Sequence, residues 1–265
     1  MKGLKNVTFG MLGAGAIGGA VIERLLALGV PPSNLFACEI RAERRDELAR
    51  LAITIADDPR NAARADLVVI AVPPVAVAPL LKRLKPVLTA SQVIVSFAAA
   101  VPVTILERLL PSGITVARVN PNSPSRVGRG WNPVSWGRHI STTGRARIEA
   151  FLEALGDAPE VPDTEMNLYT ALSAVGPTYF LPVFDAMIAA GVKAGLSRAS
   201  SVAVAVGVAR GVSDLVAAGP ELPEQLKLLT GLRPLDHDQV RELVVTAIAA
   251  AWSRMDHLQK TMEAG

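Results

Sequence analysis

Residues 7–18 read VTFGMLGAGAIG, an apolar run that passes directly into the pattern G-x-G-x-x-G. The apolar residues predict a buried parallel strand, and the apolar spacing over residues 20–28 predicts a helix that ends at Gly29. Glycines between a strand and a helix are typical of dinucleotide binding, because they allow a tight turn and the close approach of a pyrophosphate. The residues of this turn that we expect at a cofactor are Leu12, Gly13, Gly15, Ala16, Ile17 and Gly18.

Strand-like and helix-like segments alternate from here to about residue 145. The expected strands cover residues 35–39, 53–55, 67–72, 92–96 and 115–119, and the expected helices cover residues 42–51, 77–84 and 103–110. This alternation predicts an α/β Rossmann nucleotide-binding domain with a doubly wound parallel sheet over residues 1–162.

The pattern changes after residue 162 to helical segments rich in Ala and Gly. The expected helices cover residues 165–173, 178–194, 198–217 and 238–260. Small residues let helices approach closely, and such surfaces commonly pack against a second subunit. We therefore expect an all-α dimerisation domain over residues 163–265, and a homodimer or higher homo-oligomer.

The composition excludes some partners. The 27 basic and 24 acidic residues are interspersed and leave a net charge of only +3, so we expect no nucleic-acid partner. The chain enters its first strand soon after Met1 without an apolar leader, which predicts a cytoplasmic protein. The apolar run at 201–209 lies between Arg198 and Arg210 and is shorter than the roughly 20 residues of a membrane span, so no membrane partner is expected.

Neither cysteine nor histidine is arranged to bind a metal. A single cysteine, Cys38, cannot form an internal disulfide and suits a small core position. The three histidines, at 139, 237 and 257, lack metal-ligand spacing. We expect those at 139 and 257 on the surface, and Asp236 or Asp238 as the cap of the last helix.

Glu39 lies 21 residues after Gly18 (39 minus 18), at the end of the second expected strand. An acid at this spacing typically accepts hydrogen bonds from the adenosine ribose hydroxyls, which favours NADH. Arg41, Arg44 and Arg45 follow directly, and an arginine here could hold the 2′-phosphate of NADPH or simply form a solvated start of a helix. We expect NADH or NADPH, with a slight preference for NADH, because a carboxylate repels a phosphate unless the arginines neutralise it.

Five further segments resemble, in order, patterns of the pyrroline-5-carboxylate reductase family. ADLVVIAVPP at 65–74 resembles ADVVILAVKP, SFAAAV at 96–101 resembles SxAAGV, ARVNPNSPSRVG at 117–128 resembles VRxMPNTPAxVG, LSAVGPTY at 172–179 resembles LSGSGPAY, and AGVKAGLSR at 190–198 resembles AGVKxGLPR. The resemblance implies a Rossmann domain joined to a helical dimerisation domain, with the active site between them. It also implies hydride transfer from NAD(P)H to the C=N carbon of a small substrate.

The resemblance carries roles to particular residues. The cofactor would be lined by Asp58 (where the family usually has asparagine), Ala71, Val72, Pro73, Ala98 and Ala99, in addition to Arg41, which its position after Glu39 already makes a candidate. Asn122 would lie near the nicotinamide, Thr178 and Thr230 are further catalytic candidates, and Gly176, Pro177 and Arg233 are candidate substrate contacts.

The substrate loop departs from the family. The family's TSPGGTT, whose backbone and threonine hold the substrate carboxylate, corresponds here to LTGLRPLD at 229–236, where only Thr230 matches. The serine of LSGSGPAY is replaced by Val175. Arg233 could hold a carboxylate by a two-pronged hydrogen bond, although a surface loop arginine is the commoner case.

Other functions therefore stay open. A dinucleotide-binding accessory or regulatory dimer without imine reductase activity would also tolerate a changed loop. Another NAD(P)-linked oxidoreductase, such as one exchanging hydride with a deazaflavin, would keep the nucleotide fold. A β-hydroxyacid dehydrogenase is disfavoured because Lys193 lies within the AGVKxGL match.

Overall fold

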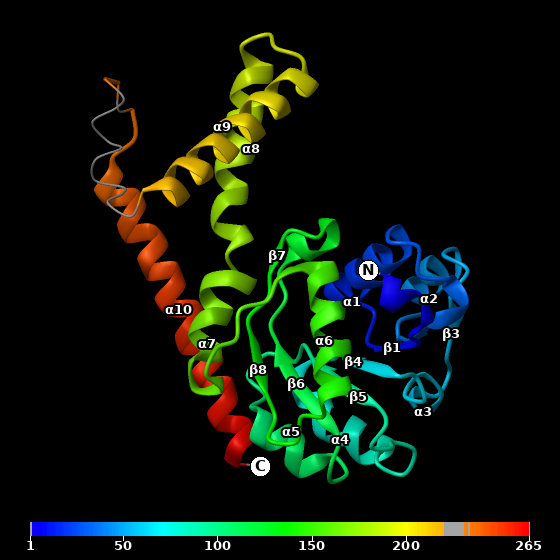
Figure 1. Ribbon diagram of the computed structural model, residues 1–265. Coiled ribbons are helices and arrows are strands. Elements are labelled where there is room, and N and C mark those ends of the chain that lie inside the picture. The colour runs from blue at the N-terminus through cyan, green and yellow to red at the C-terminus, as the bar shows by residue number, and fades with distance from the viewer. Residues whose placement is uncertain (1, 220–230, 233, 265) are drawn as a thin grey trace. The chain divides into compact units, whose positions relative to one another are not determined.

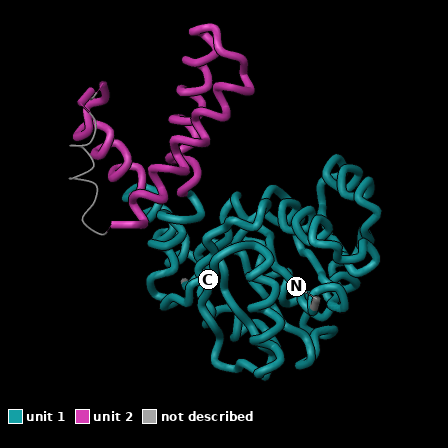
Figure 2. Tube along the Cα trace, turned by 45° about the horizontal axis from the view of Figure 1, so that its top comes forward, with its two compact units in different colours: residues 1–175, 249–265 teal, residues 176–248 magenta. Residues whose placement is uncertain are grey.

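The computed structural model describes residues 2–219, 231–232 and 234–264. It divides into two compact units, shown in different colours in Figure 2: unit 1 is Met1–Val175 together with Ala249–Gly265, and unit 2 is Gly176–Ile248. The expected domain boundary at residues 162 and 163 stays a prediction.

Unit 1 is built on a seven-stranded sheet with the order β3-β2-β1-β4-β5-β6-β8 (Figure 1). The strands are β1 (Phe9–Leu12), β2 (Leu35–Cys38), β3 (Thr54–Ile55), β4 (Leu67–Ile70), β5 (Val93–Ser96), β6 (Thr115–Val119) and β8 (Val134–Trp136). All neighbouring pairs are parallel except β6 and β8, which are antiparallel. The strand order reverses between β1 and β4, which is where ligands bind in doubly wound sheets.

Helices cover both faces of this sheet. They are α1 (Ala16–Ala27), α2 (Ala42–Ala49), α3 (Pro59–Ala62), α4 (Pro74–Leu84), α5 (Val103–Leu109) and α6 (Thr142–Leu155), with 3₁₀ turns η1 (Lys2–Asn6), η2 (Pro32–Asn34), η3 (Ser123–Val127) and η4 (Asp163–Glu165). One apolar cluster joins α1 and α6 to one face, and a second joins α3, α4 and α5 to the other. Alternate strand residues enter the two clusters, as the two-residue period of a strand requires.

The segment after β6 departs from the expected alternation. Two short strands, β7 (Gly130–Trp131) and β9 (Gly156–Asp157), form a separate parallel pair, and β8 adds an antiparallel edge to the sheet. The helix expected over 165–173 is broken into α7 (Met166–Tyr169) and a π-helical turn, η5 (Thr170–Ala174). The expected helix over 20–28 begins earlier, at Ala16, directly after the glycine turn.

Unit 2 is helical over its described residues. It contains α8 (Pro177–Lys193), α9 (Arg198–Ala218) and the first part of α10 (His237–Ala264). A side chain at Gly191 of α8 would begin 2.5 Å from the Ser201 hydroxyl of α9, so the two helices pack at close range. Asp236 caps α10, since its Oδ1 accepts hydrogen bonds from the backbone N–H groups of Asp238 and Gln239 at 3.1 and 3.0 Å.

The apolar run at 201–209 is part of a longer helix. By length and composition, two stretches of the described chain could cross a membrane, Asp163–Lys193 and Arg198–Ala218. The run itself is shorter than a membrane span, but the helix that contains it, Arg198–Ala218, has 21 residues. The expectation that there is no membrane partner stays a prediction.

Candidate functional site

The glycine turn connects β1 to α1 at the point where the strand order reverses. Gly13 has a φ of +89°, and its N–H donates to the Cys38 carbonyl at 2.9 Å. A side chain at Gly15 would begin 3.3 Å from Nη2 of Arg41, and one at Gly18 would clash with the Gly13 carbonyl. The backbone therefore stays bare beside the start of α1, whose first N–H groups have no intrahelical acceptors, and this geometry fits a pyrophosphate.

Glu39 follows β2 and is only 6% exposed. Its Oε1 accepts from the N–H groups of Ile40 and Arg41 at 3.0 and 3.1 Å, and its Oε2 accepts from the N–H of Ala14 at 3.1 Å. The Arg41 guanidinium adds a two-pronged contact, with Nε and Nη2 each 3.1 Å from a carboxylate oxygen. Glu39 thus holds the glycine turn against the end of β2.

These contacts set the charge of Glu39. Burial raises the pKa of its carboxyl, but the hydrogen bonds from the Arg41 side chain and from the backbone of Arg41 and Ala14 outweigh burial and bring the pKa to about 2. A ribose hydroxyl would have to share an oxygen already occupied, or displace the Arg41 guanidinium, which is 61% exposed.

The next two strand ends place the other expected cofactor residues at the same edge of the sheet. Ala71, Val72 and Pro73 follow β4, and Pro73 precedes α4. Asp58 caps α3 and pairs with Arg60 and Arg83 at 2.6 and 3.1 Å. The hydrogen bonds from Arg60, on its side chain and backbone, hold the pKa of Asp58 well below its usual range.

The turn after β5 carries Ala98 and Ala99, and then Ala100, which stands where the family pattern has glycine. Ala100 is fully buried with a φ of +59°, in the left-handed region that L-residues other than Asn and Asp rarely adopt. The positive φ explains why the family pattern has glycine at this position. Ala100 adopts the same conformation with strain.

Asn122 lies after β6 and is 8% exposed. Its Oδ1 accepts from the Trp131 N–H at 3.1 Å, and its Nδ2 donates to the Ser173 carbonyl at 3.2 Å. The Trp131 ring lies against the Tyr169 ring, with centroids 5.7 Å apart. Asn122 is thus held in place by β7 and η5.

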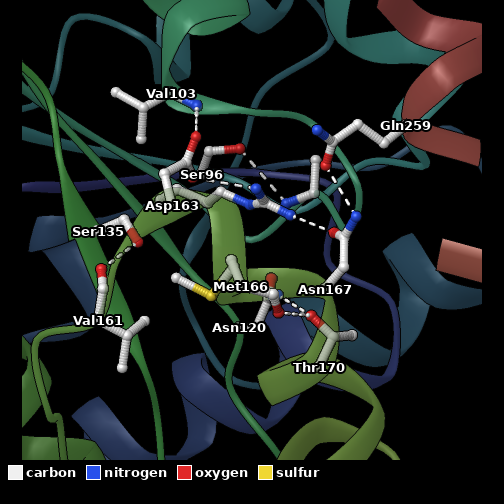
Figure 3. Close-up of polar contacts among 12 residues, drawn as sticks. Ser96, Val103, Asn120, Ser135, Val161, Asp163, Met166, Asn167, Thr170 and Gln259 are labelled. Carbon is white, nitrogen blue, oxygen red and sulfur yellow. Dashed lines mark hydrogen bonds and ion pairs between the residues drawn. The ribbon is translucent and has the colours of Figure 1, made fainter. Parts of the chain in front are cut away.

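A polar seam begins four residues before Asn122, at Arg118, and joins β6 to the segment 163–174. Arg118 is fully buried and donates from Nη1 to Asp163 at 3.0 Å and from Nη2 to Asn167 at 2.8 Å. Asn120 donates to the Thr170 hydroxyl, which itself donates to the Met166 carbonyl. Figure 3 shows Asn120 beside Thr170, and Asp163 and Asn167 further along the same seam, where each accepts a hydrogen bond from Arg118.

The seam extends to the C-terminal helix. Asn167 Nδ2 donates to Asp256 at 2.9 Å and to Gln259 at 2.8 Å, both on the part of α10 that belongs to unit 1 (Figure 3). Burial lowers the pKa of Arg118, although its pairing with Asp163 opposes this effect. The remaining guanidinium atom, Nε, has no hydrogen-bond partner.

The remaining expected site residues lie elsewhere in the chain. Gly176, Pro177 and Thr178 form the start of α8 in unit 2. Thr230 and Arg233 lie outside the described residues. The three histidines are exposed, and the described part of the chain holds no group of three His, Cys, Asp or Glu side chains arranged for a metal.

Sequence reasoning missed Trp131, whose N–H fixes the Asn122 amide oxygen, and the neighbouring pair of Asn120 and Thr170. It also missed Arg126, which lies beside the glycine turn. Asn120 departs from the family's methionine, and this was the available signal. Arg126 falls on a variable position of VRxMPNTPAxVG, so the resemblance gave none.

Comparison with known proteins adds the following. The family model described as "NADP oxidoreductase coenzyme F420-dependent" matches residues 8–100, and that described as "Pyrroline-5-carboxylate reductase dimerisation" matches residues 163–258. The chain is 32% identical to pyrroline-5-carboxylate reductase of Pseudomonas aeruginosa over 82% of this chain and 80% of that protein. It is 29% identical to the Corynebacterium melassecola enzyme of that name over 96% of this chain and 99% of that protein.

The solved structure of Plasmodium falciparum pyrroline carboxylate reductase with NADP bound is similar in fold. Its TM-score is 0.83 at 23% identity, and the match covers 97% of this chain and 99% of that chain. Together with the observed sheet, these matches confirm the expected Rossmann domain followed by a helical domain.

We predict that Ala100→Gly raises the free energy of unfolding by about 0.5–1 kcal/mol, because glycine adopts a positive φ without strain. Ala99→Gly, at a neighbouring residue without a positive φ, is the matched control and should lower it by a similar amount. Urea denaturation measures both. Equal destabilisation by the two variants would show that Ala100 is not strained.

We predict that Glu39→Gln removes a pH-dependent part of the stability. Because the folded pKa is below the ordinary 4.5, the contribution of Glu39 is complete above about pH 4.5 and is lost as the pH falls towards 2. The gap in unfolding free energy between parent and variant, up to about 3 kcal/mol, should close over that interval. Glu43→Gln, which keeps Glu39, should follow the parent. A gap that is constant between about pH 6 and about pH 3 would contradict this role.

Proposed function

Since this chain belongs to the pyrroline-5-carboxylate reductase family, we propose that it is an NAD(P)H-dependent reductase that transfers hydride to the carbon of a C=N bond in a small substrate. The observation that carries the proposal is the similarity over nearly the whole chain to enzymes of that name. The bare glycine turn at the reversal of strand order supports it, because it offers the pyrophosphate site that such a cofactor needs.

The described residues suit this chemistry. The cofactor would be held by the glycine turn, with Ala71, Val72, Pro73, Ala98 and Ala99 lining the neighbouring strand ends, and when bound it supplies the hydride. Asn122 has both its amide oxygen and its amide nitrogen engaged, so it presents a fixed polar wall at the carboxyl end of β6. Reduction of a protonated imine needs orientation more than acid or base catalysis, and a pre-organised amide supplies orientation.

We propose that Gly176, Pro177 and Thr178, at the start of α8, contact the substrate. Thr230 and Arg233 are further candidates for this role. We propose that pyrroline-5-carboxylate itself is a poor substrate. The family's glycine pair and terminal threonines, which hold the carboxylate, are missing from 229–236, and each lost charge-assisted hydrogen bond weakens binding by roughly 1.5–3 kcal/mol.

The preference between cofactors rests on Glu39 and Arg41. We propose a small preference for NADH, because a 2′-phosphate next to the ionised Glu39 is repelled unless Arg41 neutralises it. The Arg41 guanidinium does contact Glu39, so the margin is small.

The described part of unit 2 supports a homodimer. Its helices carry exposed apolar side chains, including Phe180, Leu181, Val183, Val204, Val208 and Val212. The family model for pyrroline-5-carboxylate reductase dimerisation covers the same helices, so we propose that a second copy of the chain buries this surface. We also propose that the protein is cytoplasmic.

We predict that sedimentation equilibrium gives a mass of at least twice the 27.8 kDa of one chain. Val204 and Val208 are exposed and lie four residues apart on α9. Replacing both with aspartate should lower the mass to that of one chain, because the charges would be buried in the dimer interface without partners. A parent that sediments as a single chain would refute the homodimer.

We predict that the parent oxidises NADH or NADPH in the presence of cyclic imines, with an efficiency on pyrroline-5-carboxylate below about 10⁴ M⁻¹s⁻¹. Gly15→Val should abolish cofactor binding, because the side chain would fill the approach of the pyrophosphate. Gly3→Val, placed in open space, is the control. Cofactor binding without reduction of any imine would favour the accessory-protein alternative over a reductase.

A further inference from the structure

A hollow of about 350 Å³ opens beside the glycine turn in unit 1. It is lined by Gly15, Ala16, Ala20, Glu23, Arg41, Arg44 and Arg126. The three small residues leave the first two turns of α1 open to solvent, and three guanidinium groups face the same space. The hollow therefore combines a helix N-terminus with three cations.

The arginines come from different parts of the chain. Arg41 and Arg44 lie at the start of α2, and Nε of Arg44 donates to the Ala14 carbonyl at 2.8 Å. Arg126 comes from η3, more than 80 residues later, and its Nη2 lies 2.6 Å from Oε2 of Glu23 on α1. This ion pair connects η3 to α1 beside the glycine turn.

The Arg126–Glu23 pair is easily broken. Arg126 is 64% exposed and Glu23 is 34% exposed, so water can replace either partner at little cost. Among the residues that the structure describes, Glu23 is the one carboxylate that lines the hollow. The partners of Arg41 and Arg44, Glu39 and Glu47, do not line it. An anion in the hollow would attract Arg126 and repel Glu23.

A phosphate is a better partner than Glu23 for this arginine. Guanidinium groups bind phosphate with two parallel hydrogen bonds, and the backbone N–H groups at the start of α1 favour the same charge. The family pattern leaves the position of Arg126 open, so this contact is not part of that pattern.

We propose that Arg126 binds the pyrophosphate of the dinucleotide and that Glu23 acts as a latch, holding Arg126 until the cofactor displaces it. That the ligand is a dinucleotide rests on the proposed function. That the hollow binds an anion rests on its own geometry and charges. Glu23 then weakens cofactor binding, since it competes with the phosphates for the same guanidinium.

The test measures dissociation constants of NADH, NADPH and inorganic pyrophosphate by fluorescence and calorimetric titration. Arg126→Leu should weaken both dinucleotides and pyrophosphate about tenfold, the size of one charge-assisted hydrogen bond. Glu23→Gln should tighten all three a few-fold, because it removes a competing negative charge. In the double variant the Glu23 effect should be smaller than in the parent background, because the competition for Arg126 is gone and only the direct repulsion between Glu23 and the anion remains.

Arg129→Leu is the matched control, because Arg129 is an exposed arginine three residues further along the chain that does not line the hollow. It should leave all three constants unchanged, and circular dichroism should show every variant folded. Arg126→Leu should also reduce the salt dependence of binding.

Unchanged constants in Arg126→Leu would overturn the proposal while leaving the reductase assignment intact. A parent that binds pyrophosphate through Arg126 but binds neither dinucleotide would uphold the anion site and overturn the proposed function. A Glu23→Gln variant that binds more weakly than the parent would overturn the latch.

Discussion

The buried guanidinium of Arg118 is the constraint on which the arrangement around Asn122 depends. A fully desolvated cation must be paired, and breaking such a pair by removing one partner typically destabilises a fold by about 3–5 kcal/mol. Its partners, Asp163 and Asn167, come from the segment after the sheet, and Asn167 in turn bonds to α10. The last parallel strand, α7 and the C-terminal helix are thereby obliged to meet at one point.

From Arg118, a row of hydrogen bonds extends along the chain to Asn122. Arg118, Asn120 and Asn122 follow one another at intervals of two residues, or about 6.6 Å along an extended chain. Their partners Asn167, Thr170 and Ser173 follow at intervals of three residues, or about 4.5 Å along a helix. Two of the partners, Thr170 and Ser173, lie in the π-helical turn Thr170–Ala174, and π turns frequently occur at functional sites.

Sequence patterns predicted the elements whose structure depends on residues close to one another along the chain. The glycine turn, β6 at Thr115–Val119 and the helical texture after residue 175 follow from spacing along the chain. The strands β7, β8 and β9 have only two or three residues and are defined by partners far away in the sequence, so no periodicity reveals them. Spacing predicted Glu39 at the end of the second strand, where the structure has it, but could not show that Arg41 folds back onto it. The family pattern gave no information on Arg126, because it leaves that position open.

Arginine side chains have two different roles in this fold, depending on how far each is exposed to solvent. Arg118 cannot exchange its partners, because each exchange would expose an unpaired charge to a medium of low polarity. Arg126 and its partner Glu23 are both partly exposed, so the attraction in this pair is about 1 kcal/mol or less and a new anion can replace the old partner. A permanent pair therefore holds the segments around Asn122 in place, and an exchangeable pair lies beside the glycine turn, where the proposed cofactor would enter and leave.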